Sequence, residues 1–450
     1  MLLRFGLKNY KSYKGFQNFS MISGNTKSYE DRLQKEKDFS VLKFSAIYGA
    51  NGAGKTNIID ALQHMQLLVL NGVPPFILQI YYKLDKSEKK TPSYFETDLL
   101  IEENVYTYGF EYDSVNNKLL SEWLVKINGK KEKDIYTRDM VSGTFYCNED
   151  YNKKSKGKMK IYLEDLKEEK SKLFLTFINS NKKSIVLENK ELSDIYDWFD
   201  NSLSIAAPNS ILTSGEYLFV EEKMNQLAAL LKMFGTGIQS IGGIVVDNET
   251  AFQSIPSEVI DKVKADIQET KNGKKPKKAS VLLRSDKSMW NIVMEHDEMT
   301  FKKICFYHDK NKEYPFSISD ESSGTKRIID LAEILLTDEK NKLFVIDELD
   351  RKLHPQLTCK FVQTFLEKAK CSNNQLIVTT HESRLLDFNI LRRDEIWFSN
   401  KEDSGESKIY SLDDFNVRFD KKIDKAYLDG RYGGVPIFDT IFPSIEKCQE

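Results

Sequence analysis

The chain has 450 residues, of which 40% are hydrophobic and 30% are charged. This balance is typical of a folded globular protein and excludes a disordered or fibrous chain. The 66 lysines and arginines nearly balance the 68 aspartates and glutamates, which leaves a net charge of −2. Near-neutrality argues against an unselective polyanion binder, so any nucleic-acid surface has to be a local patch. The length corresponds to about three domains or lobes.

The cysteines and the apolar segments of the sequence indicate in which cellular compartment the protein lies. The five cysteines are scattered and include no C-x-x-C pair, which favours reduced thiols over disulfides or a zinc site. The amino terminus has no signal-peptide pattern, and no apolar segment approaches the roughly 20 residues that span a bilayer. We therefore predict a cytoplasmic protein without a membrane partner.

The first third of the chain predicts strands on both sides of a helix. Alternating residues 3–8 and the apolar run 44–48 indicate strands, and the spacing of apolar residues over 57–70 predicts a helix. Even-numbered alternation over 94–127 predicts an antiparallel sheet, with a hairpin turn at 115–117.

Helical patterns dominate the middle of the chain. Residues 153–160 are predicted to form a basic loop, 163–232 to be mostly helical, and 257–270 to form an amphipathic helix that starts at a serine cap. Strand-like alternation returns over 280–319. After Glu321 the pattern helix, strand, helix, strand predicts a parallel α/β lobe.

Residues 49–56 read GANGAGKT and match the phosphate-loop pattern G-x-x-x-x-G-K-[ST] in full. The motif follows a predicted strand and opens a predicted helix, so its backbone N–H groups can curl around phosphate oxygens. We expect Lys55 to reach the β and γ phosphates and Thr56 to ligate Mg²⁺. A chance glycine-rich turn is the alternative. The motif predicts an ATP site formed by Asn51, Gly52, Gly54, Lys55, Thr56 and Asn57.

An acid pair follows a second apolar run, residues 343–346. Asp347 is expected to hold Mg²⁺ and Glu348 to polarise the attacking water as the catalytic base. Without the phosphate loop upstream, a solvated turn would explain the same pair of acids.

Two further motifs complete the order of an ABC-type ATPase. Ser322, Ser323 and Gly324 precede a predicted helix and offer a second phosphate-binding site, although a plain serine helix cap explains them better when they stand alone. His381 follows a buried strand and could hydrogen-bond the γ-phosphate; the alternative is a satisfied histidine at a strand end. Asp350 fits the loop that crosses to a partner protomer and contributes to the nucleotide site.

More than half of the chain separates Thr56 from Ser322, far too much for a loop. In ABC-type geometry the signature of one subunit closes on the ATP held by another. Because each motif occurs once, closure requires a second chain, and we predict a homodimer or higher homo-oligomer.

These motifs fit a three-part α/β chain. Residues 1–150 are expected to form the first half of a P-loop ATPase head with an antiparallel β subdomain. Residues 151–279 would form a largely helical insertion. Residues 280–450 would form the second half of the head, with the signature, the acid strand and the switch histidine.

Residues 44–62 (FSAIYGANGAGKTNIIDAL) resemble the phosphate-loop segment of SMC, RecF and OLD-type ATPases. The closer resemblance, over most of the chain, is to a bacterial family of AAA-type, ABC-like ATP-binding proteins of abortive infection and anti-phage defence. The stretches that carry it are Tyr106–Phe110, Ser121–Leu124, Phe234–Ile238, Glu321–Arg327, Asp347–Pro355, Gln375–Glu382, Arg392–Trp397 and Tyr427–Pro436.

The resemblance implies the ATPase component of a two-gene defence system, including the PARIS type. Such an ATPase assembles and holds a separate toxic nuclease until a phage trigger protein appears. OLD-type relatives carry a Toprim nuclease after the ATPase, whereas only a short stretch follows His381. We therefore expect no nuclease domain in this chain.

Other interpretations stay open. A RecF-like DNA-repair ATPase would bind DNA in an ATP-dependent way, and a nuclease in its own right would cleave with Mg²⁺ alone. The lysine-rich stretch 271–278 suits a solvated loop, or a contact to nucleic acid or an acidic trigger protein. Residues 295–298 favour a hairpin turn over a metal site. The segment near Glu122 is the candidate for the Gln loop, and Arg431 and Tyr432 could either pack internally or contact a partner.

Overall fold

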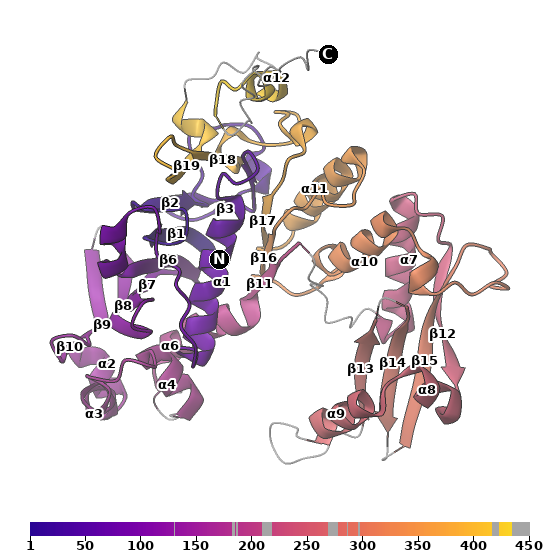
Figure 1. The fold of residues 1–450 in the computed structure, drawn as a ribbon, viewed down its shortest axis with the longest axis horizontal. Helices are drawn as coiled ribbons and strands as arrows, with labels where there is room; N and C mark the ends of the chain where they lie inside the picture. The colour runs from indigo at the N-terminus through magenta and orange to yellow at the C-terminus, as the bar shows by residue number, and fades with distance from the viewer. Residues whose placement is uncertain are drawn as a thin grey trace, which may run out of the picture. The chain divides into compact units, whose positions relative to one another are not determined.

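The computed structural model describes residues 1–129, 131–181, 185, 188–208, 218–268, 278–285, 287–295, 298–415 and 423–433. The chain divides into two compact units (Figure 1). Unit 1 comprises Met1–Pro208, Glu339–Arg351 and Leu366–Glu450, and unit 2 comprises Asn209–Asp338 and Lys352–Phe365. Their limits do not coincide with the three predicted parts, and that division stays a prediction.

Unit 1 contains a six-stranded sheet in the order β11-β16-β17-β5-β18-β19. Its strands are β11 (Leu203–Ala206), β16 (Leu343–Ile346), β17 (Gln375–Thr379), β5 (Phe44–Tyr48), β18 (Ile396–Lys401) and β19 (Ser407–Ser411). All neighbours pair in parallel except β18 and β19. Every residue of β5, β16 and β17 is buried, as expected for central parallel strands. The residues that follow these three strands therefore meet at one edge of the sheet.

The second sheet of unit 1 is antiparallel, in the order β10-β9-β8-β7-β6-β1-β2. Its strands are β1 (Leu2–Lys8), β2 (Gln17–Ser20), β6 (Ser93–Ile101), β7 (Asn104–Asp113), β8 (Lys118–Asn128), β9 (Lys131–Asp139) and β10 (Thr144–Cys147). The predicted sheet over 94–127 and its hairpin turn are confirmed. The turn between β7 and β8 uses Asn117 at φ 53°, a conformation that asparagine tolerates better than most residues.

Helix α1 (Lys55–Asn71) lies between the two sheets (Figure 1). Its side chains Ile58, Ile59 and Leu62 belong to one continuous core with Phe5 of β1 and Val345 of β16. The apolar spacing that predicted this helix thus reflects burial against both sheets.

Short helices follow the antiparallel sheet: α2 (Glu149–Lys154), α3 (Lys158–Asp165), α4 (Phe174–Asn181), α6 (Lys190–Asp197) and a π-helical turn (Trp198–Ser202). The predicted basic loop over 153–160 is wrong. Four of its five lysines lie on α2 and α3, which are joined through Gly157 at a φ of 81°. Met159 and Leu163 are buried beneath these lysines.

Glu122 of β8, in the candidate segment for the Gln loop, links the sheet to α4. Its carboxylate is fully buried and accepts hydrogen bonds from Arg138 Nη1 at 2.9 Å and from the Phe174 amide at 2.7 Å. The hydroxyls of Tyr108 and Tyr136 donate to it as well. Both carboxylate oxygens are therefore engaged inside the core.

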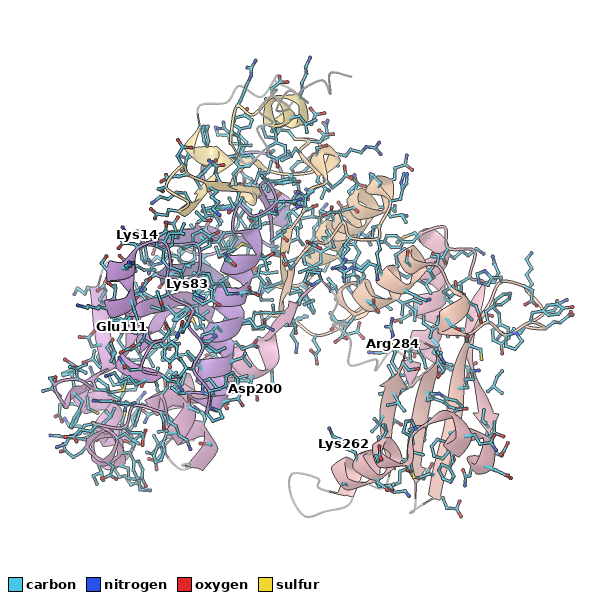
Figure 2. All side chains as sticks on the ribbon, viewed as in Figure 1. Lys14, Lys83, Glu111, Asp200, Lys262 and Arg284 are labelled. Carbon is cyan, nitrogen blue, oxygen red and sulfur yellow. The ribbon has the colours of Figure 1, made fainter. Side chains whose placement is uncertain are left out.

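Unit 2 is built on a four-stranded antiparallel sheet in the order β12-β15-β14-β13. Its elements are β12 (Ser240–Val246), β13 (Lys278–Arg284), β14 (Met289–Glu295), β15 (Glu298–Tyr307), α7 (Glu221–Met233), α8 (Asn248–Ser254), α9 (Ser257–Gln268) and α10 (Ser323–Leu336). Arg284 of β13 (labelled in Figure 2) forms an ion pair with Asp330 of α10, which ties that helix to the sheet.

The predicted strands over 280–319 are confirmed as far as Tyr307, the end of β15, whereas 308–319 hold turns and the start of a 3-10 helix. The predicted helix at 257–270 is confirmed over Ser257–Gln268. Ser257 is the first helical residue rather than the cap. Residues 296 and 297 of the predicted turn, and 271–277 of the predicted basic loop, lie outside the described residues, although Glu295 pairs with Glu298 across β14 and β15. Helix α11 (Pro355–Ala369) follows β16 along the chain.

The expected fold class is confirmed: an α/β head with a parallel sheet, an antiparallel β subdomain and a middle region in which helices predominate. None of the helices in the described part of the chain has the length and apolar run that a bilayer crossing requires.

Candidate functional site

The phosphate loop connects β5 directly to α1. Gly54 precedes the helix at φ 109°, and no side chain caps the helix start. A Cβ on Gly54 would lie 2.6 Å from the Ser407 hydroxyl oxygen, so only glycine fits both the backbone angle and the space. The first N–H groups of α1 are therefore left to a ligand, which favours an anion.

Two hydroxyl groups hold the loop from beneath. Tyr13 donates to the Gly54 carbonyl at 3.0 Å, and Ser399 donates to the Ala53 carbonyl at 2.8 Å. Both hydroxyls belong to buried residues that the sequence analysis did not identify. They approach the loop from segments far along the chain, β18 and the turn after β1, and no local pattern marks them.

Ser12 extends this support. Its hydroxyl oxygen lies 2.7 Å from the Asn57 amide nitrogen and 2.8 Å from the Ser407 hydroxyl. Asn57, predicted to contact nucleotide, therefore uses its side chain to anchor the first turn of α1. Asn51 and Gly52, in contrast, are exposed at the crest of the loop.

Lys55 lies inside the loop with only 7% of its surface exposed. Its ammonium donates to the carbonyl oxygens of Gly49 at 2.7 Å and Ala50 at 3.1 Å. Burial lowers the pKa of Lys55 to about 8, and the carboxylates of Asp347, Asp350 and Glu348 oppose that shift. The predicted phosphate-binding lysine and the predicted acids thus share one electrostatic site.

The hydroxyl of Thr56 donates to Asp347 Oδ2 at 2.8 Å, across 291 positions of sequence. Asp347 follows β16 and is only 2% exposed, whereas Thr56 is exposed. A hydroxyl and a carboxylate oxygen in contact are hard oxygen donors of the kind that Mg²⁺ prefers. The two predicted metal ligands therefore lie together and fit the ion.

Strand β17, which neighbours β16 in the sheet, forms hydrogen bonds with both Asp347 and Glu348. Thr379, the last residue of β17, donates its hydroxyl proton to Asp347 Oδ1. The hydroxyl oxygen of Thr379 in turn accepts the Glu348 N–H at 2.8 Å. This threonine also lay outside the predicted set, although it stands two residues before His381.

Glu348, the predicted base, sits in the left-handed region at φ 53°. Non-glycine residues seldom adopt this conformation outside functional or tightly determined sites. Its carboxylate is partly exposed and lies 3.6 Å from the Arg351 guanidinium. The side chain therefore lies partly exposed at the edge of the sheet, beside the phosphate loop.

Asp350 and His381 lie at the same edge. Asp350 Oδ1 accepts from the Thr380 hydroxyl at 2.6 Å and from the His381 N–H at 3.2 Å. Desolvation by its neighbours and the nearby Lys55 charge lower the pKa of His381, although the residue keeps access to solvent. A neutral imidazole next to the loop can donate one hydrogen bond.

The signature residues belong to unit 2, whereas every other predicted site residue belongs to unit 1. Ser322 caps α10, because its hydroxyl accepts the Thr325 N–H at 3.0 Å. Ser323 opens the helix and Gly324 follows in its first turn. Beside them lies a pocket of about 470 Å³, where His308 Nε2 is 2.9 Å from the buried Glu321 carboxylate.

The segment 423–433 packs against the sheet edge. Tyr427 of helix α12 (Ile423–Leu428) makes a hydrogen bond to the backbone of Gly49, and its ring and that of Tyr432 each stack on Phe398 at 5.6 Å. Tyr432 is thus a packing residue. Arg431 is exposed.

Comparison with known proteins places these motifs in a described family. The family described as "AAA domain, putative AbiEii toxin, Type IV TA system" matches residues 44–146 and 240–387. Those ranges hold the phosphate loop, the signature, the acid strand and His381. No curated protein matches the chain.

Two solved structures are similar to the chain at low identity. One is the SMC head domain from Thermotoga maritima, at 12% identity and a TM-score of 0.35, covering 91% of this chain and 98% of that one. The other is an SmcHead bound to the C-winged helix domain of ScpA, at 16% identity and a TM-score of 0.37, covering 91% of this chain and 97% of that one.

Proposed function

Because the chain belongs to the AAA-domain family described with putative AbiEii toxins of type IV toxin–antitoxin systems, we propose that it binds and hydrolyses ATP as an ABC-type ATPase. The observation that carries the proposal is the hydrogen bond between Thr56 and Asp347. It joins a complete phosphate loop to the acid strand, next to Glu348, the proposed catalytic base.

Each residue then has a role in phosphoryl transfer. The exposed crest of the loop and the uncapped start of α1 bind the phosphates through backbone N–H groups. When nucleotide binds, the Lys55 ammonium donates its hydrogen bonds to phosphate oxygens instead of to the loop carbonyls. Thr56 and Asp347 would hold Mg²⁺, which when bound neutralises charge on the phosphates. Glu348 accepts the proton of the attacking water, and His381 donates a hydrogen bond to the γ-phosphate.

We propose that the site becomes complete only between two copies of the chain. In this arrangement Ser322, Ser323 and Gly324 of a second copy close on the ATP bound in unit 1, and Asp350 lines the crossing loop. A two-fold dimer has two such sites, since each copy supplies one phosphate loop and one signature.

ATP-driven closure would control a separate effector. The family description, with its toxin and toxin–antitoxin terms, supports a role in abortive infection. The chain would act there as the sensor and scaffold that holds a toxic nuclease and releases it when a phage trigger protein arrives. This role places it in the cytoplasm, where both phage proteins and effector are made.

Two variants test the ATPase assignment. Glu348→Gln should bind ATP with parent-like affinity and hydrolyse it at least about 100-fold more slowly, because the base is lost while the phosphate seat stays. Lys55→Ala should weaken ATP binding itself. Nucleotide affinity by calorimetry and phosphate release measure the two effects separately. Parent-rate hydrolysis by Glu348→Gln would show that Glu348 is not the base.

A second experiment tests the defence role. The chain is expressed alone and together with the products of its neighbouring genes, with and without phage infection. We expect no toxicity from the chain alone, co-purification with a neighbour, and growth arrest on infection that Lys55→Ala abolishes. Toxicity of the chain alone would instead make it the toxin. Salt-sensitive, ATP-dependent DNA binding by the isolated chain would favour a RecF-like repair ATPase.

A further inference from the structure

We propose that Thr379 is the positioning residue of the site: its hydroxyl orients Asp347 toward the metal and fixes the backbone from which Glu348 projects. This inference rests on the ATPase assignment and names a residue on β17 outside the four motifs. It concerns the state of the acids before nucleotide arrives.

The Thr379 hydroxyl uses both of its hydrogen-bonding directions on the acid pair. It donates its single proton to Asp347 Oδ1 and accepts the Glu348 N–H at 2.8 Å. Thr379 is fully buried, so water cannot take over either bond. A β-branched side chain in a strand has restricted rotation about χ1, and the hydroxyl is therefore held in one direction.

The two oxygens of Asp347 consequently have different partners. Oδ1 is bound to Thr379, and Oδ2 receives the Thr56 hydroxyl at 2.8 Å. Rotation of the carboxylate would break both bonds. Oδ2 is thus preset as the oxygen that faces Thr56, which is the arrangement that a shared metal ion needs. Groups that orient a metal ligand typically change metal affinity 10- to 100-fold when they are removed.

The backbone of Glu348 is anchored at the same point. Its left-handed φ of 53° is uncommon for a residue with a side chain, and its N–H bond to Thr379 holds it there. The following amide, that of Leu349, donates to the Thr379 carbonyl at 3.0 Å. Thr379 therefore binds two consecutive amides of the turn from which the base projects.

The test measures metal binding apart from hydrolysis. Mn²⁺ is titrated into the ADP-loaded chain and followed by electron paramagnetic resonance. Thr379→Val, which keeps the shape and removes the hydroxyl, should weaken Mn²⁺ binding about 10-fold or more. Thr379→Ala should repeat the loss, and Thr379→Ser should stay within about 3-fold of the parent. ADP affinity in EDTA should be unchanged in all three, because Lys55 and the loop are intact.

Thr358 provides a matched control. It is also fully buried, and its hydroxyl has no hydrogen-bond partner among the described residues. Thr358→Val should therefore bind Mn²⁺ as the parent does. The rate of ATP hydrolysis should rank the variants in the same order as their Mn²⁺ affinity. The Mg²⁺ concentration that gives the half-maximal rate should be raised in Thr379→Val and unchanged in Thr358→Val.

Parent-like Mn²⁺ binding by a folded Thr379→Val or Thr379→Ala would overturn the proposal. So would a Thr379→Ser variant as weak as Thr379→Val, because the methyl group rather than the hydroxyl would then matter. Failure of the ATPase assignment is a separate result: it would appear as an absence of ATP hydrolysis by the parent chain, whatever the metal affinity of the Thr379 variants.

Discussion

At the scale of single residues, Glu395 shows how burial can make stability depend on pH. It lies at the entrance to β18 with 1% of its surface exposed, and its carboxyl accepts the Arg392 N–H at 2.8 Å. Burial raises the pKa of Glu395 from 4.5 to about 8. The folded chain thus keeps a proton that the unfolded chain releases above about pH 4.5.

The free energy of unfolding should therefore contain a contribution from Glu395 that falls between about pH 4.5 and pH 8 and levels off above pH 8. Glu395→Gln, which stays neutral, should flatten this part of the profile, with the largest gain over the parent near pH 8 to 9. Urea unfolding at a series of pH values measures it. An unchanged slope in the variant would show that Glu395 is ionised in the folded chain.

The sequence predicts the site residues that belong to motifs, but not the residues that support them. Lys55, Thr56 and Asp347 belong to motifs whose spacing predicts a nucleotide site, and the structure brings these residues together. Tyr13 and Ser399 support the loop through single hydroxyls. Nothing in their own neighbourhood distinguishes them from other buried polar residues, so only the folded chain identifies them.

At the scale of elements, a buried ion pair fastens α4 and the preceding loop to the antiparallel sheet. Arg138 of β9 pairs with Glu122 of β8, and both side chains are fully buried. Arg138 also donates to the carbonyls of Leu166 and Glu169, in the segment that leads to α4. One arginine of β9 therefore binds groups of the neighbouring strand and of a loop.

Breaking this pair should be costly. Arg138→Met is expected to lower the free energy of unfolding by about 3–5 kcal/mol, because it leaves a buried carboxylate without its counter-charge. Combining it with Glu122→Gln should cost less than the sum of the two single changes. The exposed pair Lys133–Asp150 is the control: Lys133→Met should cost less than about 1 kcal/mol. Equal losses at both pairs, measured by urea unfolding, would contradict this account.

Element prediction succeeded where one local pattern dominated. The pattern of residues 44–70 correctly predicts a strand, a loop and a helix, because the apolar residues of the strand and the helix are the ones that are buried in the core. Residues 153–160 misled because five lysines among eight residues suggest a solvated loop, whereas two short helices bury Met159 beneath that charged surface. The hairpin turn between β7 and β8 could be predicted from Asn116 and Asn117.

At the scale of the whole molecule, the nucleotide-binding motifs are divided between two compact units of the chain. The phosphate loop, the acids and His381 belong to unit 1, and the signature belongs to unit 2. Sequence order predicts all four motifs, and the single copy of each predicts that a second chain completes the site. The central claim is that the signature acts on the nucleotide of another copy.

Mixing two inactive variants tests this claim most directly. Lys55→Ala lacks a working phosphate loop, and Ser323→Arg lacks a working signature. A mixed dimer contains one site with both defects and one site with neither. If copies exchange freely, half of the dimers are mixed, so an equimolar mixture should recover roughly a quarter of the parent ATP hydrolysis rate. A mixture no more active than the two variants assayed separately, although tagged copies co-purify, would contradict the account.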